Sequence, residues 1–312
     1  MPRTRFLWAT DVGDPISCIS VSDAGCMAGS MLGRVWQLRL AGHGSPPEPE
    51  RLAGYSEDGV RGLHVDAERS YCTLLDKCQI WKQGFSTASP VEPIRFTQLD
   101  RKSAQSVKHV LQRGPWVCVL FSMSSTVVNI VEQRHHHRAF KLMDFGSASE
   151  VAPCDFDGES LVVADRSSLG SPPVFRVVQL ERNDQTEVDA IPHAGMISLI
   201  KLWRQDYLVY VIASSLYIYD IRKKQVRGTL RGHNAEILAV DAQDDRTIVS
   251  MSADGVVHFW DDVGNCLRTL RVPEATFFLG FPYFVCACGH RVLLSADEGV
   301  FLAETDGAEN RV

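Results

Sequence analysis

The chain has 312 residues, of which 45% are hydrophobic and 22% charged, a composition that excludes extensive disorder and supplies ample material for a core. Lys and Arg number 32 against 38 Asp and Glu, and the resulting net charge of −6 argues against nucleic acid as the partner. No apolar run reaches the roughly 18 residues of a membrane span and no secretory signal is recognised, so we expect an intracellular protein, cytoplasmic or nuclear.

The first predicted strand is Arg3–Thr10, and three short strands follow it between Ile16 and Leu38. Gly33 marks a tight hairpin in this set, before a strand that contains Trp36. A similar set lies between Val60 and Trp81. The chain therefore begins as short strands joined by turns, which is typical of an all-β protein.

The middle of the chain keeps the rhythm of short strands with fewer turn signals. Predicted strands lie within Val107–Val131 and Glu150–Leu180, and three more within Ile197–Asp220. His135, His136 and His137 are consecutive, so on extended backbone their side chains alternate and cannot all face one metal ion. We expect a solvated turn between two strands at these histidines.

The most regular set of strands lies between Gly232 and Arg271. Its four predicted strands are residues 237–241, 247–251, 256–260 and 266–271, and Asp254-Gly255 forms a tight turn before the third. A last set is predicted at residues 276–281, 283–289 and 291–297. It contains Cys286 and Cys288, whose spacing is that of one strand face and lacks a metal-binding CxxC pattern.

The segment Gly232–Arg271 resembles a WD repeat, because a Gly-His pair, a Ser, an Asp-Gly turn and a closing Trp-Asp occur at that family's spacing. The resemblance implies that four residues form a structural tetrad of hydrogen-bonded side chains: His233, Ser250, Asp254 and Trp260. A hydrolase triad also uses His, Ser and Asp, but the spacing and the Trp favour the structural interpretation. Buried polar groups of this kind must satisfy one another.

The sets of strands repeat at intervals of about 39–47 residues, which is the period of propeller blades. We therefore predict an all-β fold, a single seven-bladed β-propeller of four-stranded antiparallel blades over residues 1–312. A single blade cannot bury both of its faces, so the blades must stack. We expect the N-terminal strand Arg3–Thr10 to complete the last blade, with Gly299–Glu304 as the competing candidate.

The sequence contains no GxGxxG, P-loop, GxSxG or HExxH motif. Its nine cysteines are scattered through apolar segments and indicate reduced thiols. We therefore expect no catalytic residues, no cofactor and no metal, and interpret the protein as a scaffold that binds other proteins. A further alternative is an enzyme or small-ligand binder that uses the mouth of a propeller channel.

Two candidate binding surfaces follow from this interpretation. Loops before the first strands of four blades contain acidic residues and would form a negative rim suited to a basic peptide: Asp14, Asp58, Glu236 and Glu274. Tyr219, Asp220 and Arg222 resemble the motif by which some propellers dock onto the adaptor of cullin-4 ubiquitin ligases, which makes a ligase substrate receptor the alternative function. The basic stretch Arg222–Arg231 is expected to cover an outer strand.

Overall fold

Runs of β-branched and aromatic residues, separated by Gly, Asp and Ser, fold into short strands in this protein. Strands are the regular elements of the part that the structure, a computed structural model, describes. The described residues are 4–10, 14–22, 25–38, 49–52, 59–60, 62–66, 71–75, 80–84, 91–94, 107–113, 116–121, 125–129, 134–138, 153–165, 174–179, 184–188, 196–204, 206–242, 247–272, 277, 283–288, 291–297 and 299–305.

Two compact units are distinguished, and the first consists of Met1–Ala104, Ala253–Val257 and Leu270–Val312. It contains three sheets of four strands each. These are β2 (Ile16–Ser22), β3 (Gly25–Ser30), β4 (Val35–Leu38) and β5 (Pro49–Leu52); β6 (Gly62–Asp66), β7 (Tyr71–Leu75), β8 (Ile80–Gly84) and β9 (Val91–Ile94); and β26 (Val285–Cys288), β27 (Arg291–Ala296), β28 (Gly299–Thr305) and β1 (Thr4–Thr10).

The second unit consists of Gln105–Ser252 and His258–Thr269. Its complete sheets are β10 (Val107–Arg113), β11 (Trp116–Phe121), β12 (Ser125–Asn129) and β13 (Arg134–Arg138); β14 (Cys154–Phe156), β15 (Ser160–Asp165), β16 (Val174–Gln179) and β17 (Asp184–Val188); and β18 (Leu199–Trp203), β19 (Tyr207–Ile212), β20 (Ser215–Asp220) and β21 (Gln225–Arg231). A further sheet has the order β22 (Ile237–Ala242), β23 (Ile248–Ser252), β24 (Val256–Trp260) and β25 (Cys266–Arg271).

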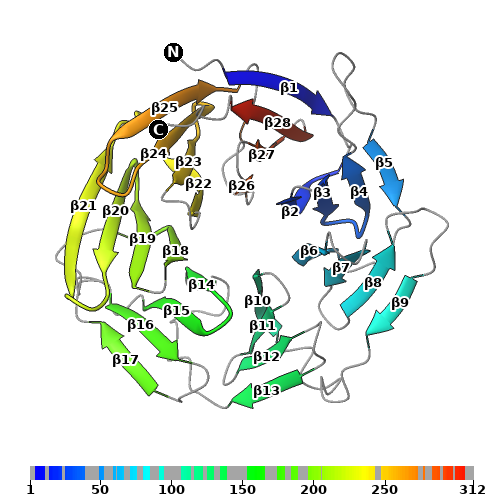
Figure 1. Ribbon diagram of the computed structural model, residues 1–312, viewed down its shortest axis with the longest axis horizontal. Helices are drawn as coiled ribbons and strands as arrows, with labels where there is room; N and C mark the ends of the chain where they lie inside the picture. Colours follow the sequence, from blue (N-terminus) through cyan, green and yellow to red (C-terminus); the bar gives the residue numbers. More distant parts are fainter. Residues whose placement is uncertain are drawn as a thin grey trace, which may run out of the picture. The chain divides into compact units, whose positions relative to one another are not determined.

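Within each sheet, strands that follow one another in sequence are neighbours, and the sheet of β26, β27 and β28, whose pairs are antiparallel, is completed by β1. β1 lies beside β28 in Figure 1 and pairs with it from Thr4↔Thr305 to Thr10↔Val300. The N-terminal strand is therefore the fourth strand of this sheet, as the sequence predicts. Gly299–Thr305 is the third strand and not a competitor for the same place.

The structure corrects the sequence analysis at two segments. The strand of the last sheet at the end opposite β1 is β26, at Val285–Cys288, whereas the predicted set begins with a strand at residues 276–281, which lie, except for Phe277, outside the described residues. The three histidines belong to strand β13 and pair with β12, as in Val127↔His136, instead of forming a turn. A strand at the edge of a sheet is held by backbone hydrogen bonds to one neighbour, which any non-proline residues can form, so the polar run Arg134–Arg138 can occupy this position.

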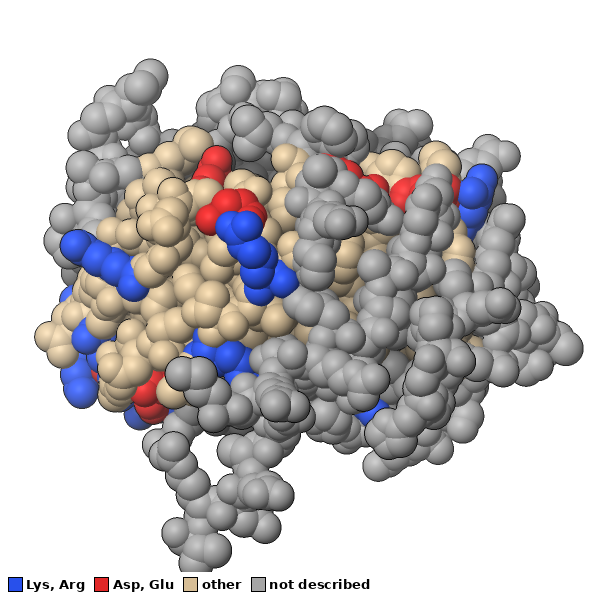
Figure 2. All heavy atoms as spheres, turned by 90° about the horizontal axis from the view of Figure 1, so that it is seen from above, with Lys and Arg blue, Asp and Glu red and all other residues tan. Residues whose placement is uncertain are grey.

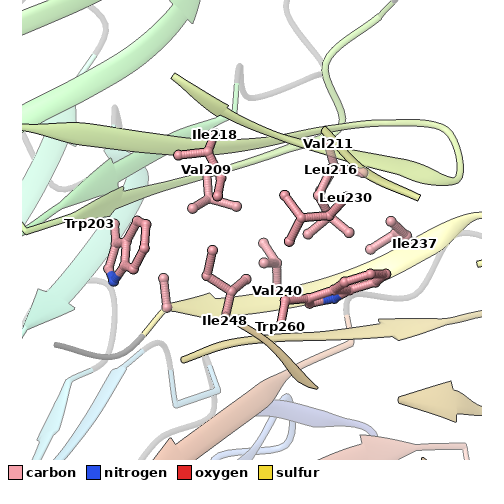
Figure 3. Packing of buried hydrophobic residues seen from close by; sticks show 11 residues of the cluster. Trp203, Val209, Val211, Leu216, Ile218, Leu230, Ile237, Val240, Ile248 and Trp260 are labelled. Carbon is pink, nitrogen blue, oxygen red and sulfur yellow. The ribbon is translucent and has the colours of Figure 1, made fainter. Parts of the chain in front are cut away.

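Buried apolar side chains fill the space between neighbouring sheets of the second unit. Figure 3 shows Val209 and Ile218 of one sheet facing Val240, Ile248 and Trp260 of the next, all fully or almost fully buried. Each such aliphatic side chain contributes about 1.5–3 kcal/mol by leaving water. In the first unit, β2, β3 and β4 supply a cluster that packs on Leu293, Val300 and Leu302 in the same way.

Candidate interaction surfaces and the buried hydrogen-bond chain

A chain of hydrogen bonds in the second unit joins three residues that the WD-repeat resemblance singles out: His233, Ser250 and Trp260. The Ser250 hydroxyl accepts a hydrogen bond from the Trp260 Nε1–H at 2.8 Å and lies 2.7 Å from His233 Nε2. His233 precedes β22, Ser250 is in β23, and Trp260 ends β24. The three side chains are buried, so the chain of bonds fixes a loop to two strands inside the protein.

The residue before His233 also has a steric role. A Cβ atom on Gly232 would lie 3.0 Å from Cη2 of Trp260, which is closer than such contacts normally come. A glycine therefore allows the backbone to approach the indole ring that takes part in the hydrogen-bond chain.

The arrangement around Ser250 does not present a nucleophile to a substrate. Ser250 is 0% exposed, and its hydroxyl is engaged by an indole and an imidazole. Asp254, the fourth residue of the predicted tetrad, is exposed in the turn between β23 and β24, and Gly255 follows it with φ of 74°. Gly255 supplies the left-handed conformation that this turn requires.

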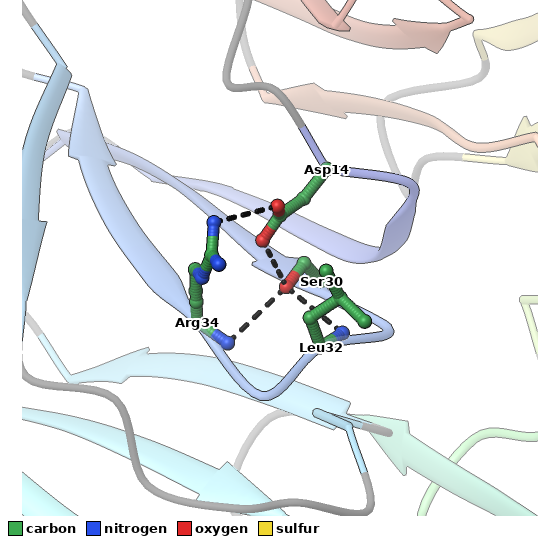
Figure 4. A network of polar contacts seen from close by, with 4 residues as sticks. All are labelled: Asp14, Ser30, Leu32 and Arg34. Atoms are coloured by element: carbon green, nitrogen blue, oxygen red, sulfur yellow. Dashed lines mark hydrogen bonds and ion pairs between the residues drawn. The ribbon is translucent and has the colours of Figure 1, made fainter.

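Asp14 is an internal residue of the first unit rather than part of an exposed rim. Figure 4 shows its carboxylate between Ser30 and Arg34: it accepts from the Ser30 hydroxyl at 3.0 Å and from Arg34 Nη1 at 2.8 Å. The Ser30 oxygen also accepts from the backbone N–H groups of Leu32 and Arg34, both at 3.2 Å. The Asp14 side chain is 1% exposed, so it holds the β3–β4 turn and offers no negative charge to a partner.

The other predicted rim residues divide into two groups. Glu236 is exposed, immediately before β22. Asp58 and Glu274 lie outside the described residues.

The three residues of the predicted docking motif have different environments. Tyr219 and Asp220 are buried, at 2% and 4% exposure, and the Asp220 carboxylate accepts from the Lys223 backbone N–H at 2.8 Å. Arg222 points outward with 76% of its side chain exposed, and its Nε lies 2.6 Å from Oδ1 of Asp206. Tyr219 and Asp220 thus stabilise the end of β20, whereas Arg222 is accessible.

The basic stretch Arg222–Arg231 covers the turn into β21 and that outer strand, as expected. Its first two cations pair with Asp206 and Asp220, and Arg227 lies over the ring of Tyr207 at 5.2 Å. Figure 2 shows both blue and red side chains on the described part of one face, so neither sign covers it alone. Two positive charges of the basic stretch are thus each paired with a carboxylate.

Two polar contacts of the second unit were missed in the sequence analysis because they join residues without a recognised motif. Asp155 in β14 accepts from the Leu202 backbone N–H at 2.8 Å and lies 3.3 Å from Lys201 Nζ, which ties two neighbouring sheets together. Cys266 lies close to His258 of the adjacent strand, with 3.5 Å between Sγ and Nδ1. Lys201 and Leu202 are 46 and 47 residues away from Asp155 in the chain, so no local sequence pattern indicates the first contact.

Within the described residues, no group of three or more His, Cys, Asp or Glu side chains is placed to hold a metal ion. Cys286 and Cys288 are half-buried and pack against the apolar cluster of the first unit. The described residues also contain no helix long and apolar enough to cross a membrane.

No family model matches the chain, and no characterised protein matches it in sequence. Solved structures are similar to it in fold: the RRP9 WD40 repeats and U3-55K each have a TM-score of 0.65 at 15% identity and cover 97% of this chain, with 97% and 100% of their own chains covered. The WD40 β-propeller domain of Doa1 has a TM-score of 0.63 at 13% identity, over 97% of this chain and 96% of that one. Identities this low establish the fold alone.

Proposed function

We propose, from the WD40 β-propeller fold of this chain, that it is a non-catalytic scaffold, a subunit or adaptor of an intracellular multiprotein complex. The observation that carries the proposal is a structural likeness that extends over nearly the whole chain. In this fold, loops on rigid sheets offer binding surfaces. The burial of Ser250 supports the proposal, because the serine of the set that resembles a hydrolase triad is enclosed in the interior and hydrogen bonded there.

The proposal includes a ring of seven blades closed by the N-terminal strand. The seven four-stranded sheets of the described residues would each be one blade, and the pairing of β1 with β28 would join the two ends of the chain in the seventh. A propeller closed in this way leaves fewer exposed sheet edges.

Affinity purification of the tagged full chain from its own cells, followed by mass spectrometry at two salt concentrations, tests the scaffold proposal. A stable set of co-purifying subunits is expected at both concentrations. Recovery of the protein alone, together with turnover of a small molecule by the pure protein, would instead favour the enzyme or ligand-binder alternative.

The partner segment that we propose is basic and is bound by the acidic residues that remain in the rim without Asp14. Glu236 is accessible for this role. The double reversal Asp58→Lys and Glu236→Lys is expected to weaken partner binding, most strongly at low salt. Glu159→Lys, in the exposed turn between β14 and β15, is the matched control. Unchanged binding in the double variant at low salt would contradict the acidic rim.

A ligase substrate receptor is the second candidate, and the exposure of Arg222 favours it. If that function is correct, Arg222→Ala should abolish co-purification of the cullin-4 adaptor. Arg231→Ala, an exposed cation on the neighbouring strand of the same sheet, should leave it intact. Capture of the adaptor by both variants would exclude Arg222 as the docking residue.

A further inference from the structure

The cysteines differ sharply in their access to solvent. Of the seven whose side chains the structure describes, only Cys266 is exposed. Burial raises the pKa of the Cys118 and Cys154 thiols, and the neighbouring Asp155 raises that of Cys154 further. These two side chains therefore remain protonated and unreactive, because the thiolate is the reactive form of cysteine.

Cys266, the first residue of β25, lies against an imidazole. Its Sγ is 3.5 Å from His258 Nδ1, 3.6 Å from Thr269 Oγ1 and 3.4 Å from the Arg268 carbonyl oxygen. Thr269 Oγ1 lies 2.8 Å from the same His258 nitrogen. One ring nitrogen of a buried histidine thus faces both an accessible thiol and a hydroxyl.

The histidine is held in place from its other side. The His258 side chain is 7% exposed, and its ring centroid lies 4.3 Å from that of His233 and 5.0 Å from that of Trp260. Both neighbours belong to the hydrogen-bond chain through Ser250. The orientation of Nδ1 toward β25 is therefore fixed by the interior of the sheet, while the sulfur atom stays at the surface.

We propose that Cys266 is a site of reversible thiol modification, with His258 as the proton acceptor and a low-molecular-weight disulfide as the co-reactant. A neutral imidazole nitrogen next to a thiol is the arrangement that activates cysteine nucleophiles. The Thr269 hydroxyl both donates and accepts, so it can turn its hydrogen away from Nδ1 and leave that nitrogen to the thiol.

The exchange is balanced in atoms and electrons. His258 Nδ1 takes the proton from Cys266 Sγ, and the thiolate attacks one sulfur of the disulfide. A new S–S bond to Cys266 forms as the bond within the reagent breaks. The released half leaves as a thiolate and takes the proton from His258, so one disulfide and one thiol give one mixed disulfide and one thiol.

Exposed apolar side chains lie close to Cys266 in the sequence. Leu267, next to Cys266, is 60% exposed, and Val263 in the preceding turn is 63% exposed. Modification would therefore place a bulky polar group on the outer strand of this sheet, among exposed apolar side chains.

The first test treats the reduced full-length protein with glutathione disulfide near neutral pH and maps the modified peptides by mass spectrometry. Cys266 is expected to be modified first, and dithiothreitol should reverse the modification. Cys266→Ser should lose the early modification, whereas Cys286→Ser, at a half-buried thiol, should keep it. Earlier modification of another cysteine, Cys72 and Cys78 included, would overturn the proposal.

The second test concerns the histidine and uses iodoacetamide as the probe. In His258→Gln, alkylation of Cys266 at pH 7 is expected to slow at least about tenfold, while the rate at about pH 10, where an ordinary thiol is ionised, stays unchanged. An equal fall at both pH values, or no fall at pH 7, would overturn the role of the imidazole.

Thr269→Val covers the case in which His258→Gln does not fold, because Thr269 is exposed on β25. Without the competing hydroxyl, alkylation at pH 7 should be at least as fast as in the unmodified sequence. A slower reaction would assign the activation to the hydroxyl and contradict the proposal.

Discussion

At the residue scale, the hydroxyl of Tyr210 carries a cost in stability. Tyr210 is 0% exposed, lies at 5.2 Å from the Phe175 ring and stacks on Tyr217, and its hydroxyl has no hydrogen-bond partner among the described residues. A buried polar group without a partner destabilises the folded state. Tyr210→Phe is therefore expected to raise the free energy of unfolding by about 1 kcal/mol in urea denaturation.

The neighbouring Tyr219→Phe is the matched control for this prediction. Tyr219 is buried in the same cluster, but its hydroxyl is not among the buried polar atoms that lack a hydrogen-bond partner, so its substitution should bring no comparable gain. Destabilisation of the protein by Tyr210→Phe would show that the hydroxyl is satisfied in solution.

The stability of the protein at alkaline pH provides a second test of the burial of Tyr210. Burial raises the pKa of Tyr210 above its ordinary value, so the unfolded state loses the phenolic proton first as pH rises. Ionisation of this tyrosine therefore leaves the free energy of unfolding unchanged below about pH 10 and lowers it as pH increases above that value. Tyr210→Phe should therefore lose less stability than the unmodified protein between about pH 10 and pH 11, as measured by urea denaturation.

Gly59 illustrates a position where only glycine fits. Its φ is +81°, and a Cβ there would lie 2.5 Å from the Met31 carbonyl oxygen of the β3–β4 turn. Gly59→Ala should lower the free energy of unfolding by about 2 kcal/mol or more. Gly228→Ala is the control: a Cβ on Gly228 comes no closer than 4.0 Å to a neighbour, so a similar loss there would contradict the steric explanation.

At the scale of elements, Asp155 joins two sheets through one carboxylate. Asp155→Ala would leave the Leu202 backbone N–H without its acceptor and should cost about 1–3 kcal/mol in urea denaturation. Asp155→Asn keeps an acceptor oxygen and loses only the ion pair with the partly exposed Lys201, so it should cost less. Equal losses in the two variants would mean that the ion pair carries the stability instead.

The strands of the best repeat could be predicted closely because their signals are local. The expected strand 256–260 is β24, and the Asp254-Gly255 turn lies where the sequence places it. The strand at Val285–Cys288 was predicted as the second of its set and not as the first, since choosing the first among several apolar runs requires knowing which run pairs with β27. The hydrophobic periodicity of one segment does not show which distant segment it pairs with.

The candidate sites show the same contrast between local signals, which the sequence reveals, and distant partners, which it does not. An Asp in a loop before a strand looks exposed in the sequence, yet Asp14 turns inward because Ser30 and Arg34 both bind its carboxylate. The pair of Cys266 and His258 had no recognised spacing, and only the alignment of β24 with β25 reveals it. Local turn chemistry was therefore predictable, whereas side-chain partners on other strands were not.

At the scale of the whole molecule, the first and last described strands share one sheet. Without β1, strand β28 would expose its backbone N–H and C=O groups along a sheet edge, which invites association with other chains. Deletion of residues 1–10 is therefore expected to lower Tm by at least about 5 °C, equivalent to about 2 kcal/mol, in scanning fluorimetry. It should also promote self-association in size-exclusion chromatography.

The control for this deletion keeps the chain length and removes only the strand character. Replacing Phe6–Ala9 by Gly and Ser residues should reproduce the loss in Tm, because Gly and Ser pack poorly in a strand and Gly has a higher entropy when unfolded. If both variants keep the original Tm and stay monomeric, the pairing of β1 with β28 does not support the sheet. A ring closed by the N-terminal strand would then lose its main support, because this pairing is the contact through which the two ends of the chain meet.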